Sequence, residues 1–186
     1  KVLLDYGHNP AAINMIGKFV DQMQVSGRKT AVVTFPGDRT DELIEESVKL
    51  LPKHFTHFIV KQDDNRRGRP SGEVAELIRS LLIKHGTKAE NIEIILDEQE
   101  AVNKALSSAV EGDYVVVFAD KVSRCWKQIT SFKSTGNVRV KDVDTRADDH
   151  LLERGEVDLI ADAISNATMR TDKRGVIIEI EEELND

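Results

Sequence analysis

The sequence predicts an α/β fold: a Rossmann-like, mostly parallel sheet with helices on both faces, followed by an appended C-terminal segment. Through about the first 130 residues, short apolar runs rich in β-branched residues alternate with longer segments of helical period. Several of the short runs are almost continuously apolar, which is typical of strands that helices cover on both sides. Alternation of this kind indicates βαβ units in a parallel sheet.

Five runs are predicted to be strands, with helices between them. The strand runs cover residues 2–4, 31–35, 57–60, 92–96 and 114–118. Apolar residues recur at helical spacing within residues 13–23, 43–51 and 74–82. A further helix is predicted after the fifth strand, where Trp126, Ile129 and Phe132 are expected to pack in the core.

Ligand chemistry is expected at one edge of this sheet. In open parallel sheets, ligands bind at the carboxyl ends of the strands, where loops lead into helices. The loops concerned begin at Asp5, Pro36, Lys61 and Ala119.

Composition and charge exclude several classes of protein. Hydrophobic residues make up 40% and charged residues 32% of the 186 residues, and no apolar run approaches the ~20 residues that span a bilayer. A net charge of −7 argues against a general nucleic-acid binder, although residues 66–69 are locally basic. The single cysteine, Cys125, cannot form an internal disulfide, and no Cys/His cluster has zinc-ligand spacing. No metal site is therefore expected.

The start of the sequence leads to two further expectations. It begins without Met, one residue before an apolar strand, so we expect the chain to be part of a longer polypeptide. It has no basic and apolar leader like that of a signal peptide, so we expect a cytoplasmic location.

The first motif, Asp5-Tyr6-Gly7-His8-Asn9-Pro10, lies at the end of the first predicted strand. Capping of the following helix by Asn9 explains two of the six positions, because Pro is favoured at the first helical residue. The hexapeptide resembles the motif Asp-Tyr-Ala/Gly-His-x-Pro, which opens the C-terminal domain of Mur ligases and folylpolyglutamate synthetases. In that family the domain closes onto a central P-loop domain and completes the ATP site. The resemblance implies that Asp5 binds the nucleotide ribose, that His8 and Asn9 lie near the nucleotide, and that the residues between them shape the turn.

The second motif, Pro36-Gly37-Asp38-Arg39, follows the second strand. A Pro-Gly turn with Asp38 as a cap explains these positions without any function. The stretch also resembles a Gly-Asp-Arg segment of amino-acid-adding Mur ligases. That resemblance implies that Arg39 holds an anionic group or the closure between domains.

The third motif, residues 61–70, matches the place of the Asp-Asn-Pro-Arg loop with which some Mur ligases bind the incoming amino acid. The four matching positions are Asp63, Asp64, Asn65 and Arg66. Asn65 replaces the Pro of the family motif, so we expect a loop of different shape. The whole run, and the stretch 118–129 after the fifth strand, most resemble the cyanophycin synthetase branch of the family.

This resemblance implies that arginine is the incoming amino acid. Arg66 then clamps its α-carboxylate, while Asp63 and Asp64 pair with its guanidinium. The alternative is a solvated loop whose internal Asp–Arg pairs contribute only about 0–1 kcal/mol each.

The resemblance covers about residues 1–133, which we predict to be the amino-acid-binding and nucleotide-closing domain. Residues 134–186 are predicted to be an appended segment, either edge strands or an oligomerisation element that makes a homo-oligomer. Within it, the run 175–180 is strand-like, 138–140 is a candidate partner strand, and 151–163 has a weak helical period.

The implied reaction is ATP-dependent and uses Mg²⁺: a carboxylate is phosphorylated, and the amine of arginine then attacks it, so that arginine is added to aspartate side chains. The sequence contains no Gly-x-x-x-x-Gly-Lys-[Ser/Thr] phosphate cradle. We therefore expect no catalytic residue in this chain, ATP and Mg²⁺ held mainly by an upstream P-loop domain of the same polypeptide, and no activity for the chain alone. The alternatives are a stand-alone nucleotide-binding module, against which the lack of a Gly-x-Gly-x-x-Gly motif argues, and a non-catalytic oligomerisation scaffold.

Overall fold

The computed structural model describes residues 1–133, 168–172 and 175–179. The chain divides into two units, Lys1–Thr135 and Gly136–Asp186. The candidate partner strand at 138–140 and the run 151–163, which has a weak helical period, lie outside the described residues. No helix in the described part is long and apolar enough to cross a membrane.

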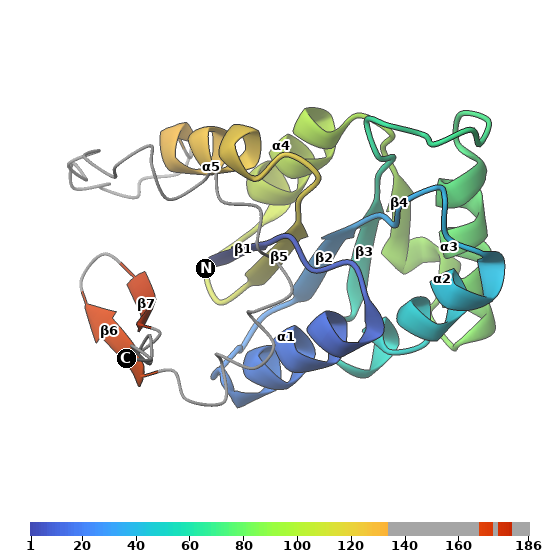
Figure 1. Ribbon diagram of the computed structural model, residues 1–186. Coiled ribbons are helices and arrows are strands. Elements are labelled where there is room, and N and C mark those ends of the chain that lie inside the picture. Colours follow the sequence, from blue (N-terminus) through green and yellow to red (C-terminus); the bar gives the residue numbers. More distant parts are fainter. Residues whose placement is uncertain (134–167, 173–174, 180–186) are drawn as a thin grey trace, which may run out of the picture. The chain divides into compact units, whose positions relative to one another are not determined.

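The first unit is an α/β fold built on one parallel sheet (Figure 1). Its strands are β1 (Val2–Asp5), β2 (Lys29–Val33), β3 (His57–Val60), β4 (Ile92–Ile94) and β5 (Tyr114–Phe118). Its α-helices are α1 (Pro10–Gln22), α2 (Asp41–Val48), α3 (Glu73–Lys84), α4 (Glu98–Ser108) and α5 (Val122–Ser131), with short 3₁₀ turns η1 (Leu51–Lys53) and η2 (Ala89–Asn91). The strand order is β1-β5-β2-β3-β4, and every neighbouring pair is parallel. The predicted fold class is confirmed.

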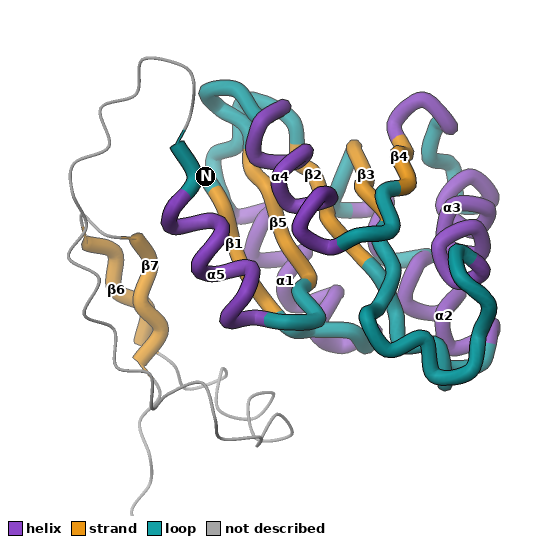
Figure 2. The backbone as a smooth tube through the Cα atoms, turned by 90° about the horizontal axis from the view of Figure 1, so that it is seen from above, coloured by secondary structure: helices purple, strands orange, loops and turns teal. Residues whose placement is uncertain are grey.

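Two hydrophobic cores lie on opposite faces of the sheet. Successive residues of a strand point to opposite faces, so Ala31 and Val33 join the core under α1, α2 and α3. Val32 joins the core under α4 and α5. Figure 2 shows this division, with α4 and α5 on one side of the strands and α1 on the other.

The packing of α5 corrects one prediction. Ile129 and Phe132 pack against the second core, but Trp126 is 49% exposed. The reason is which face of the helix each residue occupies. Cys125 is fully buried, and Ile129 and Phe132, four and seven residues later, lie on the same face. Trp126 is one residue further round the helix, and it therefore points to solvent.

The sheet order creates a switch point at the carboxyl edge. Strand β5 lies between β1 and β2, and its loop leads to α5 on one face. The loops of β1 and β2 lead to α1 and α2 on the opposite face. Loops that diverge in this way leave a crevice between them, which is where open α/β sheets bind ligands.

The described part of the second unit is an antiparallel hairpin of β6 (Thr168–Asp172) and β7 (Gly175–Glu179). Strand β7 confirms the strand predicted near residues 175–180. Its described partner is β6, which the sequence patterns did not single out. The roles assigned to residues 134–186 stay predictions.

Candidate functional site

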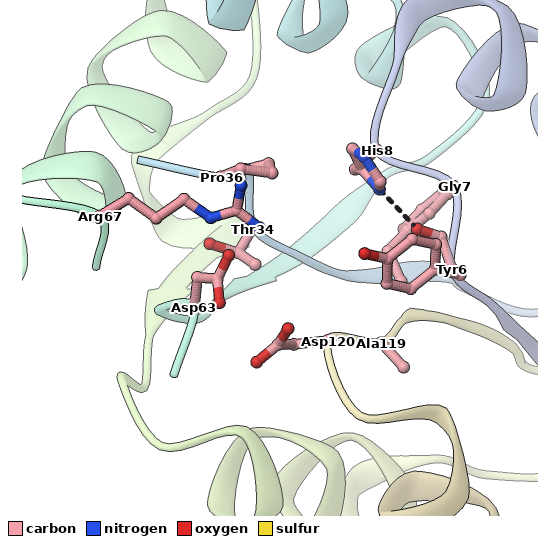
Figure 3. Close-up of a pocket in the computed structure, with 10 residues that line it drawn as sticks. Tyr6, Gly7, His8, Thr34, Pro36, Asp63, Arg67, Ala119 and Asp120 are labelled. Atoms are coloured by element: carbon pink, nitrogen blue, oxygen red, sulfur yellow. Dashed lines mark hydrogen bonds between the residues drawn. The ribbon is translucent and has the colours of Figure 1, made fainter. Parts of the chain in front are cut away.

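A solvent-open pocket of about 310 Å³ lies at the carboxyl edge of the sheet. Its walls are the ends and following loops of β1, β2, β3 and β5, as Figure 3 shows. The lining residues are Tyr6, Gly7, His8, Thr34, Pro36, Asp63, Arg67, Phe118, Ala119 and Asp120. The four loops that the sequence marked for chemistry therefore meet at one place.

The first loop is held in shape by two of its own side chains. The Gly7 N–H donates to the Asp5 carboxylate, and the Ala12 N–H donates to Asn9 Oδ1 at 2.9 Å, which confirms Asn9 as the cap of α1. Burial raises the pKa of Asp5, while the Gly7 N–H and His8 act in the opposite direction. A Cβ on Gly7 would approach the Cβ of Ala12 to 2.7 Å, so the turn requires a residue without a side chain.

One wall of the pocket consists of Tyr6 and His8. Their rings meet edge-on, with centroids 4.8 Å apart and an angle of 86° between planes. The Nδ1 atom of His8 lies 3.0 Å from the carbonyl oxygen of Tyr6 (Figure 3). Of the three residues predicted to face the nucleotide, His8 lines the pocket, and Asp5 and Asn9 lie in the turn beside it.

The third loop brings Arg67, and not Arg66, into the pocket. The Asn65 N–H donates to Asp63 Oδ1 at 3.1 Å, and the Arg67 N–H donates to Asn65 Oδ1 at 3.0 Å. Arg67 takes a φ of 49°, in the left-handed region that is unfavourable for a residue with a side chain. Its guanidinium lies on the pocket wall and donates to Asp38 Oδ2 at 2.8 Å. This contact joins the second and third loops.

Arg66 and Arg39 lie beside the pocket. Arg66 lines a neighbouring hollow of about 210 Å³ between the second and third loops. The Arg69 guanidinium donates to the carbonyl oxygens of Gly37 at 2.9 Å and Arg39 at 2.7 Å. A Cβ on Gly37 would lie 2.3 Å from the carbonyl oxygen of Arg66, so the two loops touch through their backbones. Arg39 therefore enters this arrangement through its carbonyl group.

Asp64 is engaged with an arginine of the same chain. Two nitrogens of Arg124 bind its two carboxylate oxygens at 2.8 and 3.2 Å. Bidentate pairs of this kind have a fixed geometry. Asp64 is exposed and does not line the pocket. Asp64 thus pairs with an arginine of α5, outside the third loop, and its role toward a substrate stays a prediction.

A buried charge network lies behind the pocket. Glu98 Oε1, in the first turn of α4, is 2.9 Å from Lys61 Nζ, and both side chains are inaccessible to solvent. Glu98 also accepts from the Asp120 N–H at 2.7 Å and from the Arg124 guanidinium. Burial alone would raise the pKa of Glu98, but Lys61 and the N–H donors lower it to about 2.

Two carboxylates and one hydroxyl gather on one side of the pocket. Asp63 is 7% exposed, and its pKa is raised, first by burial and also by the neighbouring Asp120. Asp120 Oδ2 accepts from the Asp64 N–H at 3.2 Å. The hydroxyl of Thr34 is buried and has no hydrogen-bond partner among the described residues. Figure 3 shows Thr34, Asp63 and Asp120 around the same space.

Sequence reasoning missed Thr34, Arg67 and Asp120 as site residues. Asp120 lies in the loop that begins at Ala119, so the rule that ligands bind at strand ends was a signal for it. Thr34 follows β2 directly, but the strand was predicted to extend to residue 35. Arg67 had a weaker signal: an Asn two residues earlier that turns the backbone.

The described residues include no group of three or more His, Cys, Asp or Glu side chains arranged to hold a metal ion. That Mg²⁺ is held mainly by an upstream domain stays a prediction.

Two comparisons of sequence identify relatives. Residues 1–120 match the family described as Mur ligase, glutamate ligase domain. A cyanophycin synthetase of Synechocystis sp. is 40% identical over 134 residues, which cover 72% of this chain and 15% of that protein. The chain thus spans about one seventh of the length of this relative.

Two solved structures with this fold are similar to the chain. A UDP-N-acetylmuramoyl-L-alanyl-D-glutamate–2,6-diaminopimelate ligase is 26% identical, with a TM-score of 0.51 over 65% of this chain and 24% of that chain. The E. coli FolC protein, solved in complex with ADP, is 20% identical, with a TM-score of 0.55 over 70% of this chain and 29% of that chain. The second likeness is one of fold alone.

Proposed function

Because the chain belongs to the Mur ligase, glutamate ligase domain family, we propose that it works as the C-terminal domain of a longer ATP-dependent amide ligase. The predicted membership of the Mur ligases, with most similarity to cyanophycin synthetases, is confirmed. The observation that carries the proposal is the pocket at the switch point, which combines the guanidinium of Arg67 with the carboxylates of Asp63 and Asp120. An amino acid carries the matching charges, a carboxylate and a cationic nitrogen.

The proposed reaction joins an amine to a carboxylate in two steps. ATP transfers its γ-phosphoryl group to the carboxylate, which gives an acyl phosphate and ADP. The neutral amine nitrogen then attacks the acyl carbon, the C–N bond forms, and the bond from that carbon to the phosphate oxygen breaks. The amine gives up a proton and inorganic phosphate leaves. With the cyanophycin synthetases as relatives, the proposed substrates are arginine and the side-chain carboxylates of aspartates.

In this proposal the chain binds and orients the amine component, and other domains supply the phosphate cradle and hold Mg²⁺. Arg67 binds the α-carboxylate, because it lines the pocket and keeps N–H donors beyond the one given to Asp38. His8 faces the nucleotide across the pocket.

The other candidate residues keep proposed roles around these groups. Asp5 and Asn9 fix the nucleotide-facing turn, and Asp5 binds the ribose. Asp64, Asn65, Arg66 and Arg39 shape the amino-acid side of the pocket through the contacts described above. Of the four positions that match the family's Asp-Asn-Pro-Arg loop, Asp63 is the one that contacts the substrate directly.

The test compares the chain with the native polypeptide that contains it. Phosphate release by the native polypeptide should require ATP, an aspartate-bearing acceptor and arginine together, and one amide should form for each phosphate. The 186-residue chain alone should bind ATP more weakly than micromolar in calorimetry and release no phosphate. Sub-micromolar ATP binding by the chain alone would instead favour a stand-alone nucleotide-binding module.

A further inference from the structure

We propose that Asp63, Asp120 and Thr34 form a binding site for a nitrogen cation of the incoming amino acid, with the two carboxylates and the hydroxyl as its acceptors. The inference rests on the proposed function, since it assigns the ligand of the same pocket. None of the three residues was expected to act in this way together: Asp63 was expected to act with Asp64, and the other two were not expected to bind substrate.

The first argument is the distribution of ion pairs around the pocket. Nearby cations have carboxylate partners elsewhere: Lys61 pairs with Glu98, Arg124 with Glu98 and Asp64, and Arg67 with Asp38. Neither Asp63 nor Asp120 forms an ion pair within the part of the chain that the structure describes. These are the two acidic side chains that line the pocket.

The second argument is the cost of the arrangement without a ligand. Asp63 is almost fully buried, and its carboxylate faces that of Asp120. Burial and a like charge both disfavour its ionised form, and the Asn65 N–H and Arg67 only partly offset them. A cation with several N–H donors offsets the repulsion and supplies hydrogen bonds, because it binds oxygens of the two carboxylates at once.

The third argument is the hydroxyl of Thr34. This residue is 8% exposed, lies directly after β2 and lines the pocket. Its oxygen has no hydrogen-bond partner among the residues that the structure describes, and a buried polar atom without a partner destabilises a fold. A valine at position 34 would have nearly the same shape and no buried polar atom without a partner. The hydroxyl is therefore explained by an acceptor role toward a ligand.

Two groups of an amino acid have this chemistry: a cationic side chain, such as the guanidinium of arginine, and the α-ammonium group. Arginine and citrulline separate them, because citrulline keeps the α-ammonium and replaces the guanidinium with a neutral urea group. If the site binds the side-chain guanidinium, it prefers arginine to citrulline, and this preference disappears in the Asp120→Asn variant. An α-ammonium site binds both equally and loses affinity for both in that variant.

The experiment measures amide chemical shifts of the 186-residue chain during titration with arginine or citrulline. Asp120→Asn should weaken arginine binding by about tenfold or more, as expected for a hydrogen bond to a charged group. Thr34→Val should weaken it by about threefold without lowering the melting temperature. The control is Glu111→Gln, an exposed carboxylate in the turn before β5, at the opposite edge of the sheet, which should bind arginine as the unaltered chain does.

The inference is wrong if arginine causes no shifts in the pocket loops, or if Asp120→Asn and Thr34→Val bind arginine as the unaltered chain does. A failure of the proposed function would give different results from a failure of the cation site. If the native polypeptide forms no amide while the chain still binds arginine through Asp120, the site stands and the ligase function falls. If the polypeptide forms the amide and Asp120→Asn leaves the KM for arginine unchanged, the function stands and the cation site falls.

Discussion

Lys61 Nζ and Glu98 Oε1 lie 2.9 Å apart, and neither side chain is accessible to solvent. Lys61 is the first residue after β3, and Glu98 is the first residue of α4. Glu98 also accepts from the Asp120 N–H and from Arg124. The pair therefore joins the third loop, which carries Asp63, to the fifth loop, which carries Asp120. A contact outside the pocket thus connects the two loops that carry the pocket carboxylates.

We expect Glu98→Gln to lower the free energy of unfolding by about 3 kcal/mol or more, because it leaves the buried Lys61 ammonium without a counter-ion. Urea denaturation measures this loss. The matched control is Glu100→Gln, an exposed carboxylate in the same turn of α4, for which we expect about 0.5 kcal/mol or less. Equal losses in the two variants would show that the buried pair contributes nothing particular to stability.

The same residue predicts how stability depends on pH. The pKa of Glu98 is about 2 in the fold, against 4.5 for an ordinary glutamate. A carboxyl group whose pKa is lower in the folded than in the unfolded chain contributes its full stabilisation at pH values above its unfolded pKa. This contribution is lost as pH falls from about 4.5 to about 2. The loss is roughly 3 kcal/mol. Unfolding free energies measured from pH 6 to pH 2 should fall more steeply for the unaltered chain than for Glu98→Gln, and parallel curves would contradict the assignment.

The contact between Gly37 and Arg66 predicts a loss that is specific to the site. In Gly37→Ala the new Cβ would lie 2.3 Å from the Arg66 carbonyl oxygen, so the second and third loops must move apart. We expect weaker amino-acid binding in titrations, by about tenfold, because small displacements at a site have large effects. Gly86→Ala is the control: its φ of 97° makes alanine unfavourable, but the residue lies at the end of α3, away from the pocket. Equal binding in the two variants would mean that this close approach does not shape the site.

The fold could be predicted because its signals are local. All five strands were predicted to within two residues at each end, since each is a short apolar run between polar loops. The meeting of four loops followed from the direction of parallel strands. Helix α4 was not singled out, because its buried residues are small, mainly Ala101, Ala105 and Val102, and give a weak apolar period.

The individual side chains of the site were harder to predict, because long-range contacts decide which of them enter the pocket. Asp64 and Arg124 are 60 residues apart in sequence, and no local pattern indicates that they form a pair. In the third loop, a turn at Asn65 and a left-handed Arg67 decide which arginine reaches the pocket. The family resemblance implies this role for Arg66, whereas Arg67 lines the pocket; which of the two binds an amino acid stays a prediction.

Asp5 offers a test of the nucleotide side of the pocket. Asp5→Ala in the native polypeptide should raise the KM for ATP by about tenfold or more, as expected from the loss of a hydrogen bond between a charged group and the ribose. Asp5→Asn is the matched variant, because its amide oxygen can still accept from the Gly7 N–H and keep the turn. If Asp5→Ala leaves the kinetics with ATP unchanged, Asp5 has only a structural role in the first loop.

The last prediction separates two adjacent arginines. Arg67 lines the pocket, whereas Arg66 lines the neighbouring hollow. If Arg67 binds the α-carboxylate, Arg67→Ala should raise the KM for the amino acid by about tenfold or more, because a charge-assisted pair is lost. The rise should be the same for arginine and lysine, since both present the same α-carboxylate.

Arg66→Ala is the control, because it removes the same charge from the neighbouring position. It should change the KM for the amino acid by less than about twofold, as expected for an exposed residue away from the ligand. Melting temperatures of both variants check that the left-handed residue in Arg67→Ala has not unfolded the loop. A large effect in Arg66→Ala with none in Arg67→Ala would return the carboxylate contact to the residue that the family motif indicated. It would also mean that the third loop changes its conformation when the amino acid binds, because Arg66 now faces the backbone of Gly37 through its carbonyl group and lies outside the pocket lining.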